Sequence, residues 1–170
     1  MLKAKQILSA GLIVSVLFVC IFLSYAQESK PIELLSPNIK GGKPVMQALQ
    51  NRKTMRDFSV KELPLQVLSD ILWAAAGINR PASGGRTAPT AVNFQEIDVY
   101  VVKPEGAYLY DAKSNVLLPV VRGDIRALTG QQTFVKDAPV NLIFVANFSK
   151  MGSNCANLPT PPTIWCRVLR

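Results

Sequence analysis

The strongest constraint on the fold is the run of residues 140–146, which is apolar almost throughout: Val-Asn-Leu-Ile-Phe-Val-Ala. A short apolar run rich in β-branched and aromatic residues is typical of a strand in the middle of a sheet. Residues 96–102 alternate polar and apolar and then run apolar, which predicts a second strand. Shorter strands are predicted at 108–110 and 116–118. These segments together predict an antiparallel meander.

Two helices are predicted upstream of these strands. Pro44 suits the first turn of a helix that carries Val45, Met46 and Leu49 on one face and ends at residues 52–58. The clearer helix is bounded by Pro64 and by Gly77. Its apolar stripe consists of Leu65, Leu68, Ile71, Leu72 and Ala75. Trp73 lies near the edge of this stripe and is interpreted as a core residue rather than a cofactor stack.

The order of elements predicts the fold class. A short helix is predicted at residues 123–130, with Ile125 and Leu128 pointing inward. The sequence of helix, helix, three strands, helix and strand has no βαβ regularity. We therefore predict an α+β fold, with an antiparallel or mixed sheet flanked by helices, within one domain.

The first 26 residues have the features of a secretory signal peptide. Lys3 and Lys5 precede an apolar run at residues 7–23, and residues 24–26, Ser-Tyr-Ala, supply small residues at the cleavage positions. The protein is therefore expected to be exported, to the periplasm or outside the cell. The alternative is an uncleaved membrane anchor through residues 7–23. No twin arginine precedes the run, so export of an unfolded chain is expected, with any cofactor acquired afterwards.

The remaining boundaries follow from composition. Residues 27–43 contain Pro31 and Pro37 and lack periodicity, which predicts a linker or N-terminal arm. The domain is expected to span residues 44–150. Residues 151–170 form an atypical tail with three prolines, no acidic residue and no strand alternation.

Composition excludes several kinds of chemistry. The chain has no histidine, which removes Ser-His-Asp and Cys-His catalysis and every histidine-based metal site. Cys20, Cys155 and Cys166 form no Cys-x-x-Cys pair, so no metal site is predicted. The net charge of +8 suits an anionic ligand. Because the basic residues are scattered rather than striped, nucleic acid is not a favoured partner.

Residues 51–58 concentrate the chemistry that a phosphate needs. Arg52, Lys53, Thr54 and Arg56 bring three cations and a hydroxyl into five residues. A helix end at this segment would add backbone N–H groups. A solvated basic turn is the alternative interpretation.

A second candidate region is the loop at residues 79–93, which is rich in Pro, Ser, Gly, Thr and Ala. Long loops in compact domains are often functional. The small side chains allow a flat ligand to approach the backbone, and Arg86 adds an anion donor. A mobile surface loop is the alternative.

The ordered set of these segments resembles the nitroreductase family of flavin oxidoreductases. The resemblance rests on Arg52-Lys53-Thr54-x-Arg56-x-Phe58, on the Leu-rich helix, on residues 86–91 (Arg-Thr-Ala-Pro-Thr-Ala) and on the strand at 95–102. It is similar to the SagB-type dehydrogenase branch, with Thr90 where that branch usually has Ser.

The resemblance implies FMN as the cofactor. It assigns the FMN phosphate and ribityl to Arg52, Lys53, Thr54 and Arg56. Pro89, Thr90 and Ala91 would lie along the isoalloxazine ring, and Asn93 or Gln95 would bond the ring edge. No side chain is expected to act as a nucleophile or general base, since the flavin carries the chemistry.

The resemblance also implies a reaction and a partner. Hydride or electrons would pass from NAD(P)H through FMN to a small-molecule substrate, either a nitroaromatic or a quinone. In the SagB-type branch the flavin would instead oxidise a heterocycle. Family members are usually homodimers with FMN at the subunit interface. A long C-terminal half completes that site, so the chain is expected to be truncated after about residue 150. A Cys155–Cys166 disulfide that stabilises the tail is the rival account.

Two other functions stay open. One is a non-catalytic flavin- or anion-binding exported domain that retains the basic cluster. The other is a structural or interaction domain, anchored through residues 7–23.

Overall fold

The computed structural model describes residues 30–59, 61–151 and 164–168. Apart from Lys30, these residues belong to one unit, Pro31–Arg170. The predicted signal peptide of residues 1–26, the alternative anchor at 7–23 and Cys155 lie outside the described residues. Among the residues that are described, no helix combines the length and apolar character needed to cross a membrane.

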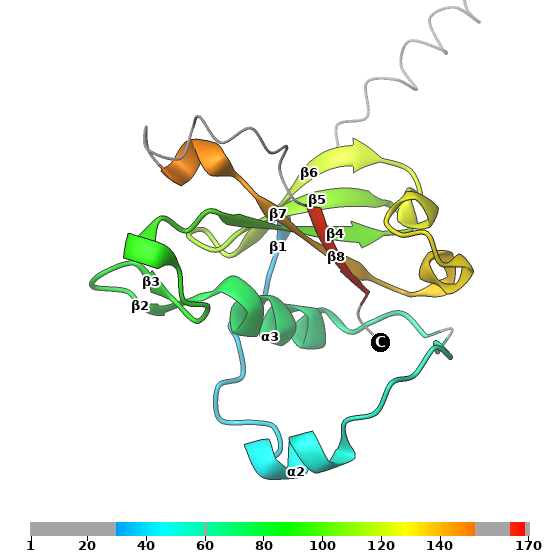
Figure 1. Ribbon diagram of the computed structural model, residues 1–170, viewed down its shortest axis with the longest axis horizontal. Coiled ribbons are helices and arrows are strands. Elements are labelled where there is room, and N and C mark those ends of the chain that lie inside the picture. The colour runs from blue at the N-terminus through cyan, green and yellow to red at the C-terminus, as the bar shows by residue number, and fades with distance from the viewer. Residues whose placement is uncertain (1–29, 60, 152–163, 169–170) are drawn as a thin grey trace, which may run out of the picture. The chain divides into compact units, whose positions relative to one another are not determined.

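A six-stranded sheet forms the centre of this unit, in the order β1-β6-β5-β4-β7-β8 (Figure 1). Every strand pair in it is antiparallel. The strands are β1 (Ile32–Glu33), β4 (Ile97–Lys103), β5 (Gly106–Asp111), β6 (Val116–Arg122), β7 (Asn141–Ala146) and β8 (Ile164–Val168). The predicted meander is β4-β5-β6, and the apolar run at 140–146 occupies an interior position between β4 and β8. The α+β class is thereby confirmed.

The core lies between α3 (Leu65–Ala76) and one face of the sheet (Figure 1). Leu68, Leu72 and Ala76 are buried against Val99 and Val101 of β4 and their neighbours. Because successive side chains of a strand point to opposite faces, these two valines share the face that α3 covers.

The buried stripe of α3 differs in part from the predicted one. Leu65 is partly exposed and Ile71 and Ala75 are only half-buried, whereas Ser69 and Ala76 are buried. Ser69 is tolerated because its hydroxyl donates to the Leu65 carbonyl at 2.8 Å and accepts from the Leu35 amide at 3.0 Å. The polar residue thus connects the helix to the N-terminal segment.

The predicted linker at residues 27–43 is wrong in part. Its residues Ile32–Glu33 form β1, which pairs with Val116 and Leu117 of β6. Leu34 is buried in the core, and its amide donates to the Asn115 carbonyl at 3.0 Å. Short apolar segments with few residues do not show strand alternation, which is why composition alone missed this one.

Helix α2 (Val45–Asn51) starts after Pro44 and ends before Arg52, as predicted. Its apolar face has no cover within the described chain, since Met46 is 77% and Leu49 60% exposed. Helix α2 therefore carries an exposed apolar face.

The helix predicted at residues 123–130 does not form. The structure has a 3-10 turn there, η2 (Arg126–Leu128), followed by η3 (Thr133–Asp137). Side chains compete for the backbone: Asp124 Oδ1 accepts from the Arg126 amide, and the Thr129 hydroxyl donates to the Arg126 carbonyl. Leu128, predicted to point inward, is exposed.

Asn141 fixes these turns to the sheet. Its buried Nδ2 donates to Thr129 Oγ1 at 2.7 Å and to the Val135 carbonyl at 3.1 Å. This explains a polar residue inside the otherwise apolar strand β7.

Two further segments differ from prediction. The tail at 151–170 shows no strand alternation in its sequence, yet β8 pairs with β7 over five residues, from Asn141↔Val168 to Val145↔Ile164. Main-chain pairing at a sheet edge does not require an alternating side-chain pattern. The loop at 79–93 contains a small hairpin of β2 (Ile78–Arg80) and β3 (Gly85–Arg86) and the turn η1 (Ala91–Asn93).

Strand β6 is longer than predicted and lies near one edge of the sheet. Beyond the two residues that pair with β1, its pairing with β5 shifts register between Ala107 and Tyr108. Pro119 lies at this irregularity, opposite Tyr108. Val120 and Val121 are exposed beside it.

The core packing makes a quantitative prediction for Leu72, which is 0% exposed. Leu72→Ala removes buried methyl groups and leaves a cavity, so it should lower the free energy of unfolding by about 2–5 kcal/mol in urea titrations. Leu128→Ala is the matched control because Leu128 is 84% exposed, and it should change stability by less than about 0.5 kcal/mol. Equal effects of the two substitutions would contradict the packing of α3.

A second prediction concerns Asp124. Hydrogen bonds from the Arg126 guanidinium, with Nη2 2.7 Å from Oδ2, lower the pKa of the Asp124 carboxyl. The stabilisation from this pair is therefore complete above the carboxyl's ordinary pKa and is lost as the pH falls through the lowered one. Arg126→Met should raise the pKa of Asp124 in carboxyl ¹³C NMR titrations. The pKa of Asp111, lowered chiefly by the Ser114 hydroxyl, serves as the internal control and should not move.

Candidate functional site

The first candidate site is built on the C-terminal end of α3. The chain leaves α3 at Gly77 and enters the β2–β3 hairpin, in which Ile78 pairs with Arg86. Thr87 then ties the following loop back to the helix: its amide donates to the Gly77 carbonyl at 2.9 Å, and its hydroxyl donates to the Trp73 carbonyl at 3.1 Å. The loop at residues 88–95 is thereby held against a rigid element.

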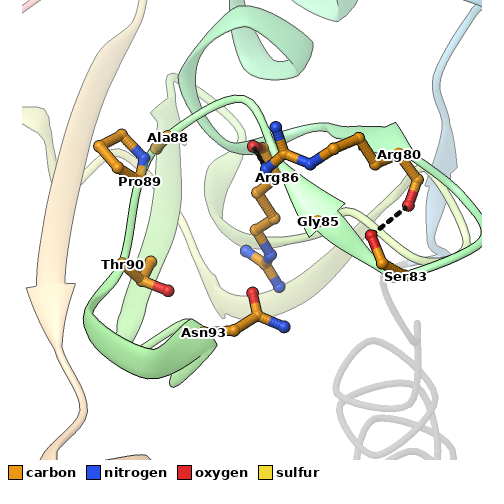
Figure 2. Close-up of a pocket in the computed structure, with 8 residues that line it drawn as sticks. All are labelled: Arg80, Ser83, Gly85, Arg86, Ala88, Pro89, Thr90 and Asn93. Atoms are coloured by element: carbon orange, nitrogen blue, oxygen red, sulfur yellow. Dashed lines mark hydrogen bonds between the residues drawn. The ribbon is translucent and has the colours of Figure 1, made fainter.

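A pocket of about 430 Å³ opens between the hairpin and this loop (Figure 2). Pocket volumes of this order suit small organic ligands. The lining includes Pro89, Thr90 and Asn93 from the predicted site, and Arg86 from the same segment. The complete lining is Arg80, Ser83, Gly85, Arg86, Ala88, Pro89, Thr90 and Asn93.

Gln95 organises the pocket. Its Nε2 donates to the Gly84 carbonyl at 2.9 Å and to Asn93 Oδ1 at 3.1 Å, and its Oε1 accepts from Arg86 Nε at 2.8 Å. The backbone N–H of Gln95 donates to Thr90 Oγ1 at 3.3 Å. One side chain therefore links both sides of the pocket.

The backbone of the loop is strained. Val92, Asn93 and Gln95 have φ values of 51°, 58° and 51°, each a conformation that costs a non-glycine residue on the order of 1–3 kcal/mol. Ala91 begins the turn η1 directly before them. The hydrogen bonds of Gln95 offset part of this cost, because they hold the loop in the strained shape.

Two guanidinium groups dominate the electrostatics of the pocket. Arg80 Nη2 donates to the Arg86 carbonyl at 2.8 Å, so the Arg80 side chain folds back over the hairpin. Arg86 lies close enough to Tyr110 of β5 to affect it: burial raises the pKa of the Tyr110 phenol, and the Arg86 charge partly opposes that rise. The pocket is thus a positive region next to the buried sheet.

The predicted phosphate cluster occupies a different surface. Arg52, Lys53 and Thr54 are exposed immediately after α2. The segment therefore follows the C-terminus of α2, which presents carbonyl groups. The free backbone N–H donors of a helix lie at its N-terminus, so they are not available to this segment.

Arg56 has a defined environment. Its guanidinium carbon lies 5.6 Å from the centre of the Phe134 ring, and the Phe58 ring is 6.3 Å from the same ring. Here a second pocket of about 550 Å³ is lined by Arg56, Asp57, Phe58, Ser59, Arg126, Lys136 and Asp137. Arg56 thus shares a pocket with two further cations, Arg126 of η2 and Lys136 of η3.

Within one chain the two predicted halves of the site lie apart. The segment after α2 leads to the N-terminal end of α3, and the β2–β3 hairpin follows its C-terminal end (Figure 1). The 12 residues of α3 span roughly 18 Å. The two pockets have no lining residue in common.

Sequence reasoning missed several lining residues. Arg80 and Gly85 belong to the loop at residues 79–93. The Gly84-Gly85 pair is the sequence signal for a close approach of backbone and side chain. Arg126 and Lys136 had no local signal, because they reach Arg56 only through the folding of segments about 70–80 residues apart.

Comparisons with known proteins identify relatives of this chain. The sequence model of the Nitroreductase family matches residues 49–156. A protein of Methanocaldococcus jannaschii named as a nitroreductase is 29% identical over 129 residues, which cover 70% of this chain and 64% of that protein. A crystal structure from Ralstonia eutropha JMP134, described as a nitroreductase, is 44% identical with a TM-score of 0.69, covering 75% of this chain and 60% of that one.

The chain therefore spans less than two thirds of the length of both relatives. The family match includes the basic cluster, α3, the pocket at residues 80–93 and the sheet from β4 to β7. This chain belongs to the nitroreductase family.

Proposed function

We propose that this chain is part of an FMN-dependent oxidoreductase of the nitroreductase type. The observation that carries the proposal is the pocket of residues 80–93, which lies inside the family match and is organised by Gln95. When bound, FMN would supply the transfer of hydride or electrons between NAD(P)H and a nitroaromatic, a quinone or a heterocycle. SagB-type chemistry and export of the protein, the latter inferred from residues 1–26, are further parts of the proposal.

The donor set of the described residues fits FMN. Thr90 and Asn93 offer a hydroxyl and an amide, and Ala88 and Pro89 offer a small apolar wall that a flat ring can approach. Gly85 belongs to the same lining. These residues would hold and orient the ring system.

The phosphate is assigned to the basic cluster. Arg52, Lys53, Thr54 and Arg56 supply charge-assisted donors, and the exposed side chains of the first three leave their donors available to a ligand. Arg56, placed over Phe134, is restrained before any ligand binds. Arg126 and Lys136 line the same pocket, where the carboxylates of Asp57 and Asp137 offset much of their charge.

We propose a homodimer because one chain keeps these two halves at opposite ends of α3. A second copy would bring the basic cluster of one subunit toward the pocket loop of the other. The exposed apolar face of α2, which directly precedes the cluster, supports this arrangement. Its burial against a second copy would remove Met46 and Leu49 from water.

The phosphate assignment can be tested by titrating FMN and following its fluorescence. Arg52→Met and Arg56→Met should each weaken binding by about 1.5–3 kcal/mol, roughly 10- to 150-fold, because each removes a charge-assisted hydrogen bond. Lys40→Met is the control for loss of one positive charge at an exposed position and should bind as the parent does. Unchanged affinity in the double arginine variant would refute the assignment.

Activity is tested separately from binding. Bleaching of flavin absorbance by NADH or NADPH, with reoxidation by a nitroaromatic or quinone, is expected of the proposed enzyme. FMN binding without bleaching by either donor would instead favour the non-catalytic flavin-binding alternative.

The dimer can be tested at α2. Met46→Glu with Leu49→Lys places charges on the exposed apolar face, so the fold should be retained while association is lost. Sedimentation velocity should show a dimer for the parent and a monomer for the variant, with weaker FMN binding by the monomer. Gln47→Lys with Gln50→Glu is the matched control, since it adds the same charges to α2 without changing an apolar residue. A parent protein that stays monomeric with FMN present would contradict the proposal.

A further inference from the structure

We infer that Arg80 and Arg86 form a subsite for the carboxylate of an aromatic substrate, in the pocket beside the loop of residues 89–93. The identity of the reaction rests on the proposed function. The presence of an anion subsite rests on the pocket alone.

The positive charge of this pocket has no acidic partner among the lining residues. Its lining contains two guanidinium groups and no carboxylate. Within the described ranges, neither Arg80 nor Arg86 forms an ion pair, whereas Lys103, Arg126 and Lys150 each pair with an acidic side chain. An anion between the two guanidiniums would offset their mutual repulsion.

Arg86 is oriented before a ligand arrives. Its Nε donates to Gln95 Oε1 at 2.8 Å, and Gln95 is itself held by Gly84 and Asn93. The guanidinium at the end of the Arg86 side chain extends toward Asn93 on the other side of the pocket (Figure 2). This geometry suits a carboxylate, which accepts two parallel N–H bonds from one guanidinium.

Arg80 is held by a close approach to glycine. A Cβ at Gly85 would lie 2.3 Å from Arg80 Nε and 2.9 Å from its Cζ, so the guanidinium occupies the space of the missing side chain. Its Nη2 bond to the Arg86 carbonyl fixes the same position at the other side. Both arginines are therefore prearranged around one pocket.

The remaining lining suggests the body of the ligand. Ala88 and Pro89 present apolar surface, and Ser83 and Thr90 present hydroxyls. Because the proposed function assigns this apolar wall to the FMN ring, the aromatic ring of the substrate would lie against the bound flavin, with its acid group toward the two arginines. An organic phosphate shares the anionic chemistry, so the phosphate of FMN is the second source that the experiment must separate.

The test compares two probes of nearly equal shape, 4-nitrobenzoate and its neutral counterpart 4-nitrobenzamide. Binding to the full chain is measured by isothermal titration calorimetry, with and without FMN. The parent should bind the anion roughly tenfold more tightly than the amide or better. Arg86→Met and Arg80→Met should each remove most of this preference, and Lys40→Met, with the same loss of charge, should retain it.

Gly85→Ala separates geometry from charge. It keeps both arginines but displaces the Arg80 guanidinium, so the ratio of nitrobenzoate affinity to nitrobenzamide affinity should fall. Because the clash involves only the end of a flexible side chain, the fold should persist, which circular dichroism checks.

Each outcome decides the inference. Equal affinity of the parent for the two probes, in both the presence and absence of FMN, would overturn it. Loss of FMN affinity in Arg80→Met and Arg86→Met as large as the loss of nitrobenzoate affinity would also overturn it, since the anion would then be the cofactor phosphate. Arginine-dependent nitrobenzoate binding by a chain that takes up no FMN would support the subsite and refute the proposed flavin function.

Discussion

The packing of α3 on the sheet is the interaction on which the other features depend. Leu68, Leu72 and Ala76 fix the helix against β4 and its neighbours, so the positions of both helix ends are set by the core. Thr87 joins the pocket loop to one end through the Gly77 and Trp73 carbonyls. The separation of the two candidate surfaces is consequently a property of the buried helix rather than of the exposed loops.

Much of the fold was predictable from local patterns. Alternation at residues 96–102 and the apolar run at 140–146 identified β4 and β7, and Pro64 with Gly77 bounded α3 correctly. The failures had two causes, one a partner distant in sequence and the other a set of local side-chain hydrogen bonds. Ser69 is buried because Leu35 supplies an amide from the N-terminal segment. The helix at 123–130 is replaced by turns because Asp124 and Thr129 take backbone groups that helix formation would need.

The candidate site shows the same division. Composition indicated the loop that contributes Pro89, Thr90 and Asn93, and the structure brings them together in one pocket. Arg80 could not be assigned from sequence, because its role depends on the hairpin register that lays it over Gly85. The stacking of Arg56 on Phe134 likewise depends on tertiary contact between residues 78 positions apart.

Pro119 affects how readily strand β6 pairs with the strands of other chains. A β-strand near a sheet edge that carries exposed Val120 and Val121 is a template on which another unfolded chain can polymerise. Proline lacks the N–H group needed for a continuous ladder, and the irregular register beside it bends the strand away from an ideal template. The strand therefore keeps its apolar residues while resisting the growth of intermolecular β-aggregates during folding.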